Sequence, residues 1–214
     1  MPCNCCEITD NAFSEAEARA EIRNYHRRGP MNQTKLILEA IRSLNLKNVD
    51  LLDIGGGIGV IHHELVGNVA RGATHVDASS AYLKEARAEA ARRRHSDQVN
   101  FIHADFTDVA DQLREADIVT LDRVVCCYPD FRRLLNAAAE HSQRALALTY
   151  PREIWYMRVG LKVINFFQGL RKDPFRVFLH PVAEMDSLIK KQGFERVLLR
   201  RLFVWEMALY RRAN

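Results

Sequence analysis

The stretch LLDIGGGIGV, residues 51–60, joins a run of apolar residues to three evenly spaced glycines. The apolar residues predict a buried strand, and Gly55, Gly57 and Gly59 predict a sharp turn from that strand into a helix over a bound ligand. Asp53 stands two residues ahead of the first glycine. A carboxylate directed at such a loop repels a phosphate and attracts a cationic group.

The glycine spacing separates two classes of nucleotide-binding protein. Dinucleotide-binding proteins follow the pattern G-x-G-x-x-G, in which the last two glycines stand three residues apart. In this chain Gly59 comes one residue too early for that pattern and is followed by Val60 and Ile61. The sequence therefore argues against an NAD-dependent dehydrogenase.

Strand-like and helix-like segments alternate along most of the chain, which predicts a parallel sheet covered by helices on both faces. The last two strand-like runs have no helix between them, so we expect them to pair as an antiparallel hairpin at the sheet edge. The expected strands are 49–54, 74–76, 99–103, 117–121, 145–149, 194–199 and 203–210. The expected helices are 14–25, 35–44, a short one through 65–66, 81–94, about 109–113, 131–140, 155–170 and 182–191.

Two more acidic residues follow predicted strands. Asp77 lies 22 residues beyond Gly55, where a carboxylate can accept hydrogen bonds from both ribose hydroxyls, and Asp105 ends the third strand. With these acids in place, LDIGGGIG resembles the first motif of the class I S-adenosylmethionine-dependent methyltransferases, whose cofactor has an ammonium, a sulfonium and no phosphate. In that family the acid at Asp105 binds the adenine amino group, and its neighbour, here Phe106, flanks the ring.

The resemblance covers about residues 20–212 and implies further cofactor contacts. Ala78, directly after Asp77, is included among the cofactor-binding candidates. Tyr25, with Arg28, lies ahead of the glycine motif in a segment that caps the cofactor in the family, so these side chains are expected near its carboxylate. Structural alternatives stay open. Asp77 and Asp105 are also suited to cap the helices that follow them, and the segment NYHRRGP, residues 24–30, is also suited to be a basic helix C-terminus without a ligand.

The carboxyl end of the fourth predicted strand is the expected place for the chemistry, because open parallel sheets bind ligands there. Asp122 is the candidate for contacting the methionyl group or for acting as a base, with an ion pair to Arg123 as the alternative. Tyr128 is the second catalytic candidate. The segment VTLDRVVCCYPD lacks the (D/N)PP(Y/F) motif of nucleic-acid amino-methyltransferases, so we expect a small-molecule acceptor and no nucleic-acid partner.

The cysteines leave a second enzymatic hypothesis open. Cys126 and Cys127 follow Asp122, and thiols gathered there could hold a soft metal or a metalloid, as in methyltransferases that act on arsenite. The competing interpretation is that the pair fills space beneath a helix, and the absence of C-x-x-C spacing favours it. The N-terminal stretch CNCC adds Cys3, Cys5 and Cys6 to the thiols that this hypothesis would use.

The sequence predicts no metal site, because His62 and His63 have no suitably spaced cysteine or acidic residue nearby. A third hypothesis is a module that binds the cofactor without turnover. The chain has neither a signal pattern nor a long apolar span, so we expect a cytoplasmic protein that does not span a membrane. The sequence does not indicate the oligomeric state.

We expect a single α/β domain: a Rossmann-like, seven-stranded, mostly parallel sheet with helices on both faces and an antiparallel last strand. Its parts are an N-terminal helical cap (1–46), a cofactor-binding core (47–150), a helical substrate lid (151–182), and the last helix with the edge hairpin (183–214). The lid is rich in aromatic residues and arginines, which suits an apolar or anionic substrate, although most of its aromatics are expected to be core contacts. This order of segments is loosely similar to that of the magnesium-protoporphyrin O-methyltransferase family, from which no substrate is carried over.

Overall fold

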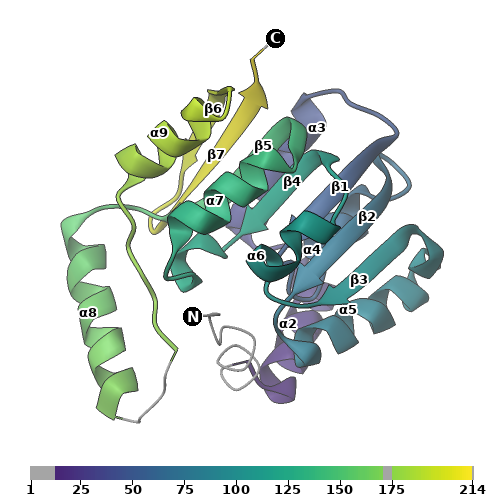
Figure 1. Ribbon diagram of the computed structural model, residues 1–214. Helices are drawn as coiled ribbons and strands as arrows, with labels where there is room; N and C mark the ends of the chain where they lie inside the picture. The colour runs from purple at the N-terminus through teal and green to yellow at the C-terminus, as the bar shows by residue number, and fades with distance from the viewer. Residues whose placement is uncertain (1–12, 171–174, 214) are drawn as a thin grey trace.

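The computed structural model describes residues 13–170 and 175–213. Within them, seven strands form one sheet in the order β3-β2-β1-β4-β5-β7-β6 (Figure 1). The strands are β1 (Val49–Ile54), β2 (Ala70–Asp77), β3 (Val99–His103), β4 (Ala116–Asp122), β5 (Ser142–Pro151), β6 (Phe194–Arg201) and β7 (Trp205–Arg212).

The strand directions confirm the predicted sheet. The strands from β1 to β5 pair in parallel, whereas β7 lies between β5 and β6 and is antiparallel to both. The predicted hairpin is therefore present, with β6 at the sheet edge and β7 inside it. An all-parallel dinucleotide-binding sheet has no such inserted antiparallel strand, so the topology also argues against a dehydrogenase.

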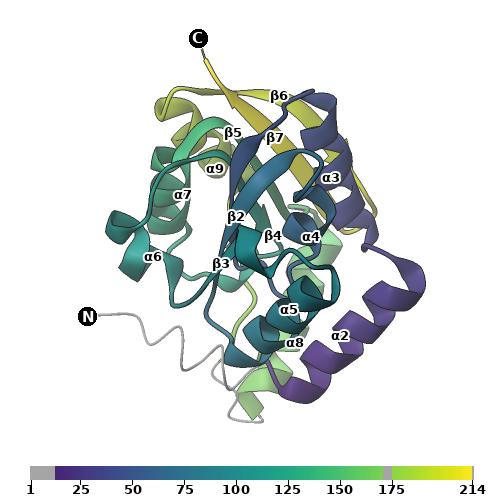
Figure 2. The same ribbon diagram turned by 90° about the vertical axis from the view of Figure 1, so that its right-hand side faces the viewer.

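Helices cover both faces of the sheet, as expected (Figure 2). One apolar cluster joins the sheet to α6, α7 and α9, and a second joins it to α3 and α4. The helix α5 packs against α2 and β3. The bounds are α2 (Glu15–Arg28), α3 (Asn32–Ser43), α4 (Val60–Leu65), α5 (Ser80–Arg92), α6 (Phe106–Val109), α7 (Phe131–Glu140), α8 (Trp155–Leu170) and α9 (Val182–Lys191), with 3-10 turns η1 (Ser96–Gln98), η2 (Ala110–Gln112) and η3 (Val125–Cys127).

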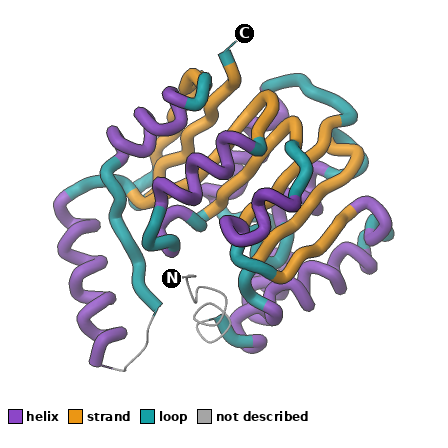
Figure 3. The backbone as a smooth tube through the Cα atoms, viewed as in Figure 1, coloured by secondary structure: helices purple, strands orange, loops and turns teal. Residues whose placement is uncertain are grey.

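The N-terminal helix α2 has well-defined ends, which fixes the segment that follows it. Ser14 caps its start in a reciprocal capping box with Glu17, and Gly29 ends it with a φ of +72° that favours glycine. The chain then turns through Pro30 and Met31 into α3. This connection lines one pocket together with the loops after β1 and β4. Figure 3 shows in teal the loops that join the strands to the helices.

The expectation that most lid aromatics are core contacts is wrong for those the structure describes. Trp155 is 76% exposed and Phe166 63% exposed, and Tyr156, Phe175 and Phe178 are only half-buried. The reason is the position of α8, which stands beside the sheet instead of lying over one of its faces (Figure 1). An apolar helical repeat shows which side chains share a face, but it does not show what covers that face.

None of the helices in the described part of the chain combines the length and the apolar character needed to cross a bilayer.

Candidate active site

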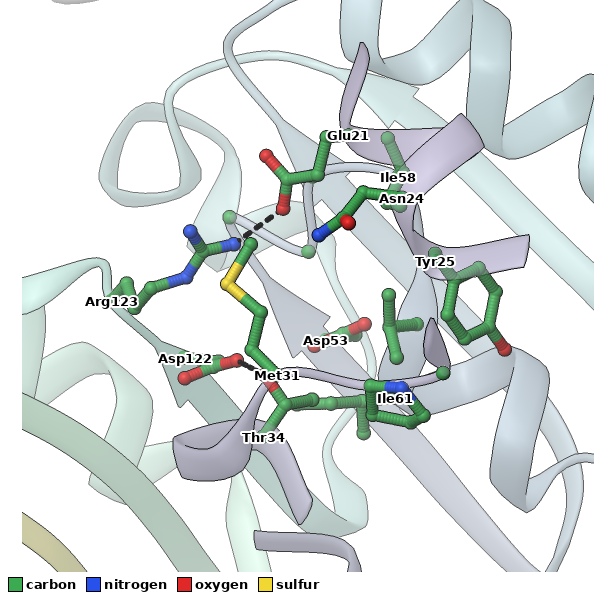
Figure 4. Close-up of a pocket in the computed structure, with 16 residues that line it drawn as sticks. Glu21, Asn24, Tyr25, Met31, Thr34, Asp53, Ile58, Ile61, Asp122 and Arg123 are labelled. Carbon is green, nitrogen blue, oxygen red and sulfur yellow. Dashed lines mark hydrogen bonds and ion pairs between the residues drawn. The ribbon is translucent and has the colours of Figure 1, made fainter. Parts of the chain in front are cut away.

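A pocket lies at the carboxyl ends of β1 and β4, beneath the connection between α2 and α3 (Figure 4). Four parts of the chain line it: the inner side of α2 with its C-terminal loop, the start of α3, the glycine loop, and the end of β4. The pocket therefore forms where the sequence predicted ligand binding.

The glycine loop makes the predicted turn from β1 into α4. Gly55, Gly57 and Gly59 all have positive φ, of +59°, +58° and +82°. The Gly55 N–H donates to the Val76 carbonyl oxygen at 2.7 Å, which ties the loop to β2. At Gly59 a side chain would also collide, because a Cβ there would lie 2.3 Å from His62 Cε1.

Asp77 fastens the end of β2 to this loop. Its Oδ2 accepts from the Gly57 N–H and its Oδ1 from the Ser79 N–H, both at 2.8 Å. Burial raises the pKa of Asp77 to about 6, against the effect of the two backbone hydrogen bonds. Ser79, and not Asp77, caps α5 through its side chain, while the carbonyl oxygen of Ala78 lies 3.1 Å from His103 Nε2.

Asp105, at the end of β3, is bonded to two neighbours. It caps α6 by accepting from the Thr107 N–H, and both of its oxygens lie 3.0 Å from the Tyr128 hydroxyl, which donates to them. Burial raises the pKa of Tyr128. Phe106 is buried in the core with its ring edge-on to His141. The fold thus brings Tyr128 to Asp105. The other catalytic candidate, Asp122, has different hydrogen-bond partners.

Asp122 and Arg123 present opposite charges to the pocket. Asp122 accepts from the Thr34 and Thr149 hydroxyls, and burial raises its pKa. Arg123 has a φ of +64° and forms an ion pair with Glu21 of α2 at 2.6 Å. The alternative considered from the sequence was an ion pair between Arg123 and Asp122. In Figure 4 the Met31 side chain extends through the pocket toward Arg123.

Asp53 lies at the base of the pocket and is fully buried. Its Oδ1 accepts from the Thr120 hydroxyl at 2.7 Å, and its Oδ2 lies 3.4 Å from His62 Nδ1. Burial raises the pKa of Asp53. The carboxylate is thus directed at the glycine loop from below, as the sequence suggested, but it is enclosed by the protein.

Tyr25 lines the pocket, although its hydroxyl is engaged elsewhere. The hydroxyl donates to Glu64 at 2.6 Å and accepts from Arg93, whose guanidinium also lies over the Tyr25 ring. Arg28 is exposed and does not line the pocket. Any contact of Tyr25 with a ligand therefore comes from its ring.

Tyr25→Phe tests this arrangement. We expect the variant to lose about 1 kcal/mol of unfolding free energy, because Glu64 and Arg93 lose a shared hydrogen-bond partner. The affinity for S-adenosylhomocysteine should change less than about threefold, or about 0.65 kcal/mol. Chemical denaturation and calorimetric titration measure the two quantities, and a large loss of affinity without a loss of stability would assign the hydroxyl to the ligand.

Several pocket residues had no signal in the sequence. Glu21, Met31 and Thr34 come from helical segments ahead of the glycine motif, and they meet Asp122 and Arg123 only after folding. No spacing rule relates positions that are about a hundred residues apart. The Glu21–Arg123 ion pair joins α2 to the residue that follows β4.

The cysteine pair lies in η3, directly after this site. Cys126 is buried and its sulfur is 3.7 Å from that of Cys127, which is half-buried. The hydrogen bond to Cys127, together with burial, raises the pKa of Cys126, so this thiol stays protonated. Cys3, Cys5 and Cys6 lie outside the described residues.

Comparison with known proteins agrees with this fold. Residues 51–144 match the family model described as a methyltransferase domain. No curated protein sequence matches the chain. The matched segment contains the glycine motif, most of β1 and the strands β2 to β4, and it agrees with the methyltransferase resemblance that the motif predicted.

Solved structures show how far the likeness extends. Magnesium protoporphyrin IX methyltransferase from Synechocystis PCC 6803, crystallised with S-adenosylhomocysteine, has a TM-score of 0.75 at 19% identity, covering 98% of this chain and 100% of that one. A putative sarcosine dimethylglycine methyltransferase from Galdieria sulphuraria has a TM-score of 0.68 at 12% identity, covering 87% and 88%. An O-methyltransferase family protein from Burkholderia thailandensis has a TM-score of 0.66 at 14% identity, covering 95% and 64%. At these identities the likeness is one of fold, and it includes the loosely similar family noted from the order of segments.

Proposed function

We propose that the protein transfers the methyl group of S-adenosylmethionine to a small-molecule acceptor. The observation that carries the proposal is the placement of Asp77, Asp105 and Asp122 at the carboxyl ends of the parallel strands β2, β3 and β4, on both sides of β1 and its glycine turn. Each acid suits a different part of this cofactor: ribose, adenine and the amino-acid tail.

The charges of the pocket fit a zwitterion. Asp122 and Arg123 lie side by side, so the ammonium of an amino-acid tail would meet the carboxylate and its carboxylate would meet the guanidinium. A pyrophosphate fits poorly, because it would meet the carboxylates of Asp122 and Glu21 as well as the Arg123 guanidinium, whereas a zwitterion has a group of each sign. Asp53 is fully buried and acts through the glycine loop, and the Met31 side chain would have to swing out of the space that the tail needs.

The other contacts follow from the strand ends. Asp77 offers its oxygens to the ribose hydroxyls while it holds the Gly57 N–H, and Ala78 lies beside it. Asp105 is oriented by Thr107 and Tyr128, so we assign Tyr128 to positioning Asp105 at the adenine end. Phe106 contributes through its main chain, since its ring is part of the core.

Methyl transfer from a sulfonium requires little acid–base catalysis by the protein. When bound, the cofactor supplies a methyl group on a sulfonium, and an acceptor in line with it displaces the neutral thioether. The residues of this chain supply alignment and exclusion of water around a charge that disappears in the transition state. The aromatic and basic segment from Trp155 to His180 is the proposed lid, and it favours an apolar or anionic acceptor.

Calorimetric titration with S-adenosylmethionine and S-adenosylhomocysteine tests the cofactor assignment. We expect binding of one molecule per chain, whereas NADH should give no heat and no fluorescence change. A subsequent screen of phenols, carboxylates, thiols and amines, read by mass spectrometry, tests turnover. Absence of binding refutes the proposal, and binding without any product in the screen favours the non-catalytic module. Loss of product in a Cys126→Ser, Cys127→Ser variant that still binds the cofactor would favour the thiol-assisted alternative.

Asp122→Asn tests the site of the ammonium. The Thr34 and Thr149 hydroxyls can donate or accept, so the fold tolerates the amide, while the charge is lost. We expect the affinity for S-adenosylhomocysteine to fall by about 10- to 100-fold, the usual range for one charged hydrogen bond. Thr34→Val is the matched variant, which removes a donor to Asp122 and keeps the charge, and it should lose less.

The same carboxylate predicts a pH dependence of binding. Burial raises the pKa of Asp122 above the ordinary value for aspartate, and an ammonium ligand requires the ionised form. Acidification should therefore weaken binding of S-adenosylhomocysteine, beginning above the pH range in which an exposed aspartate titrates. The Asp122→Asn variant should show a flatter pH profile, and an unchanged profile would remove Asp122 from the ammonium site.

A further inference from the structure

Directly beneath the glycine loop lies a cluster of three buried side chains, of which the proposed methyl transfer uses only Asp53, through the glycine loop. Asp53 at the end of β1, His62 in α4 and His75 in β2 each offer a ligand atom, and these atoms all lie within 4.8 Å of one another. All three residues are fully buried. The parallel register places His75 directly opposite Asp53, and α4 adds His62 from above.

Two of the three separations between ligand atoms match a coordination shell, and the third, between Asp53 and His75, is at most 4.8 Å. His62 Nδ1 lies 3.4 Å from Asp53 Oδ2 and 3.2 Å from His75 Nδ1. Tetrahedral Zn²⁺ with ligand bonds of about 2.0–2.1 Å separates neighbouring ligand atoms by about 3.3 Å. Hydrogen bonding explains the cluster less well, since the single Nδ1 proton of His62 cannot point at both neighbours.

The charge of the cluster is also uncompensated. Among the residues that the structure describes, Asp53 has no ion pair with Lys or Arg, and its potentially charged neighbours are His62 and His75. The two imidazole rings beside this carboxylate offer nitrogen atoms, which are common ligands of transition metals. A buried carboxylate without a cation is costly, and coordination to a metal is one of the ways in which proteins offset that cost.

We propose that Asp53, His62 and His75 bind one divalent transition-metal ion, best suited to Zn²⁺, that joins β1, β2 and α4 beneath the glycine loop. Two imidazoles and one carboxylate form a known type of zinc ligand set with a fourth position open. Asp53 also borders the pocket, so the fully buried cluster lies next to this cavity. The ion would brace the loop, because a Cβ at Gly56 would lie only 2.6 Å from Asp53 Oδ2 and 2.8 Å from His75 Cε1.

The experiment measures metal binding without any reference to methyl transfer. The full chain carries Cys3→Ser, Cys5→Ser and Cys6→Ser, because those thiols would compete for zinc, and is first stripped with a chelator. Calorimetry with Zn²⁺ and visible absorption with Co²⁺ then report stoichiometry and ligand type. We expect one ion per chain, a thermal midpoint higher by about 5 °C with Zn²⁺, and a loss of affinity of about 100-fold or more in His75→Asn and in His62→Asn.

His95→Asn is the matched control. His95 is also buried and lies 2.9 Å from His63 Nδ1 in the adjoining pair, but it contributes no atom to the three-residue cluster. Its variant should bind the ion within about threefold of the parent, less than one hydrogen bond is worth. Absence of one-to-one binding in the parent, equal loss in His95→Asn, or unchanged binding in a folded His75→Asn would each overturn the proposal. If both histidine variants fail to fold, the parent titration and the Co²⁺ spectrum still decide, and a parallel titration with S-adenosylhomocysteine keeps the result separate from the proposed function.

Discussion

Asp77→Ala should reduce the affinity for S-adenosylhomocysteine by about 100-fold or more. The carboxylate is expected to meet the ribose hydroxyls, and in the structure it also accepts from the Gly57 and Ser79 N–H groups. Alanine removes the ligand contact and leaves both backbone donors without their acceptor. Each charged hydrogen bond is worth about 1.5–3 kcal/mol, so the loss of cofactor binding should be among the largest of any single substitution at the proposed cofactor site.

Calorimetric titration measures the affinity, and thermal unfolding shows whether the variant is folded at the temperature used. Asp111→Ala is the control, because Asp111 is exposed and lies in η2, away from the glycine loop. We expect the control to bind like the parent. If a folded Asp77→Ala protein binds S-adenosylhomocysteine as tightly as Asp111→Ala does, the ribose cannot lie at the end of β2, and the proposed cofactor orientation fails.

Gly59→Ala should be the most destabilising single substitution in the glycine loop, by about 2–5 kcal/mol. Two costs add. A φ of +82° costs an L-residue about 1–2 kcal/mol, and overlap in a packed interior typically costs a further 1–3 kcal/mol. The overlap is severe, because the new Cβ would lie 2.3 Å from His62 Cε1 and 2.8 Å from His63 Nε2, and both rings are buried.

Gly67→Ala separates the two costs. Gly67 has a φ of +83°, nearly that of Gly59, but a Cβ there would meet nothing within 4 Å. The control should therefore lose only the backbone part, about 1–2 kcal/mol. Chemical denaturation of both variants gives the difference, which is the steric cost at the histidine rings. Equal losses in the two variants would mean that His62 and His63 move aside and that the loop is less tightly packed than it appears.

The success of the strand predictions has a local cause. The β1 strand, the helix α7 and the helix α9 have the predicted bounds, because an apolar run of fixed period between polar or glycine positions is a short-range signal. The exposure of Trp155 and Phe166 was missed because it depends on where α8 lies relative to the sheet, and no short-range pattern encodes that position.

The candidate site also has a part that the sequence predicted and a part that it did not. Glycine spacing and acids at strand ends are short-range features, so Asp77 and Asp105 could be singled out from the sequence, and the parallel topology brings such strand ends to one edge of the sheet. The pairing of Glu21 with Arg123 and of Thr34 with Asp122 joins positions 102 and 88 residues apart, which no motif relates. These contacts needed the tertiary structure.

The sequence by itself determined the class of fold and the kind of cofactor, because both depend on the period of apolar residues and on the chemistry of one loop. Only the tertiary structure decided which side chains share a space. His62 gave no reason to predict a metal site, since its two partners in the cluster, Asp53 and His75, come from the strands β1 and β2. The register of β1 against β2 sets His75 opposite Asp53, and that register is fixed by the packing of the whole sheet.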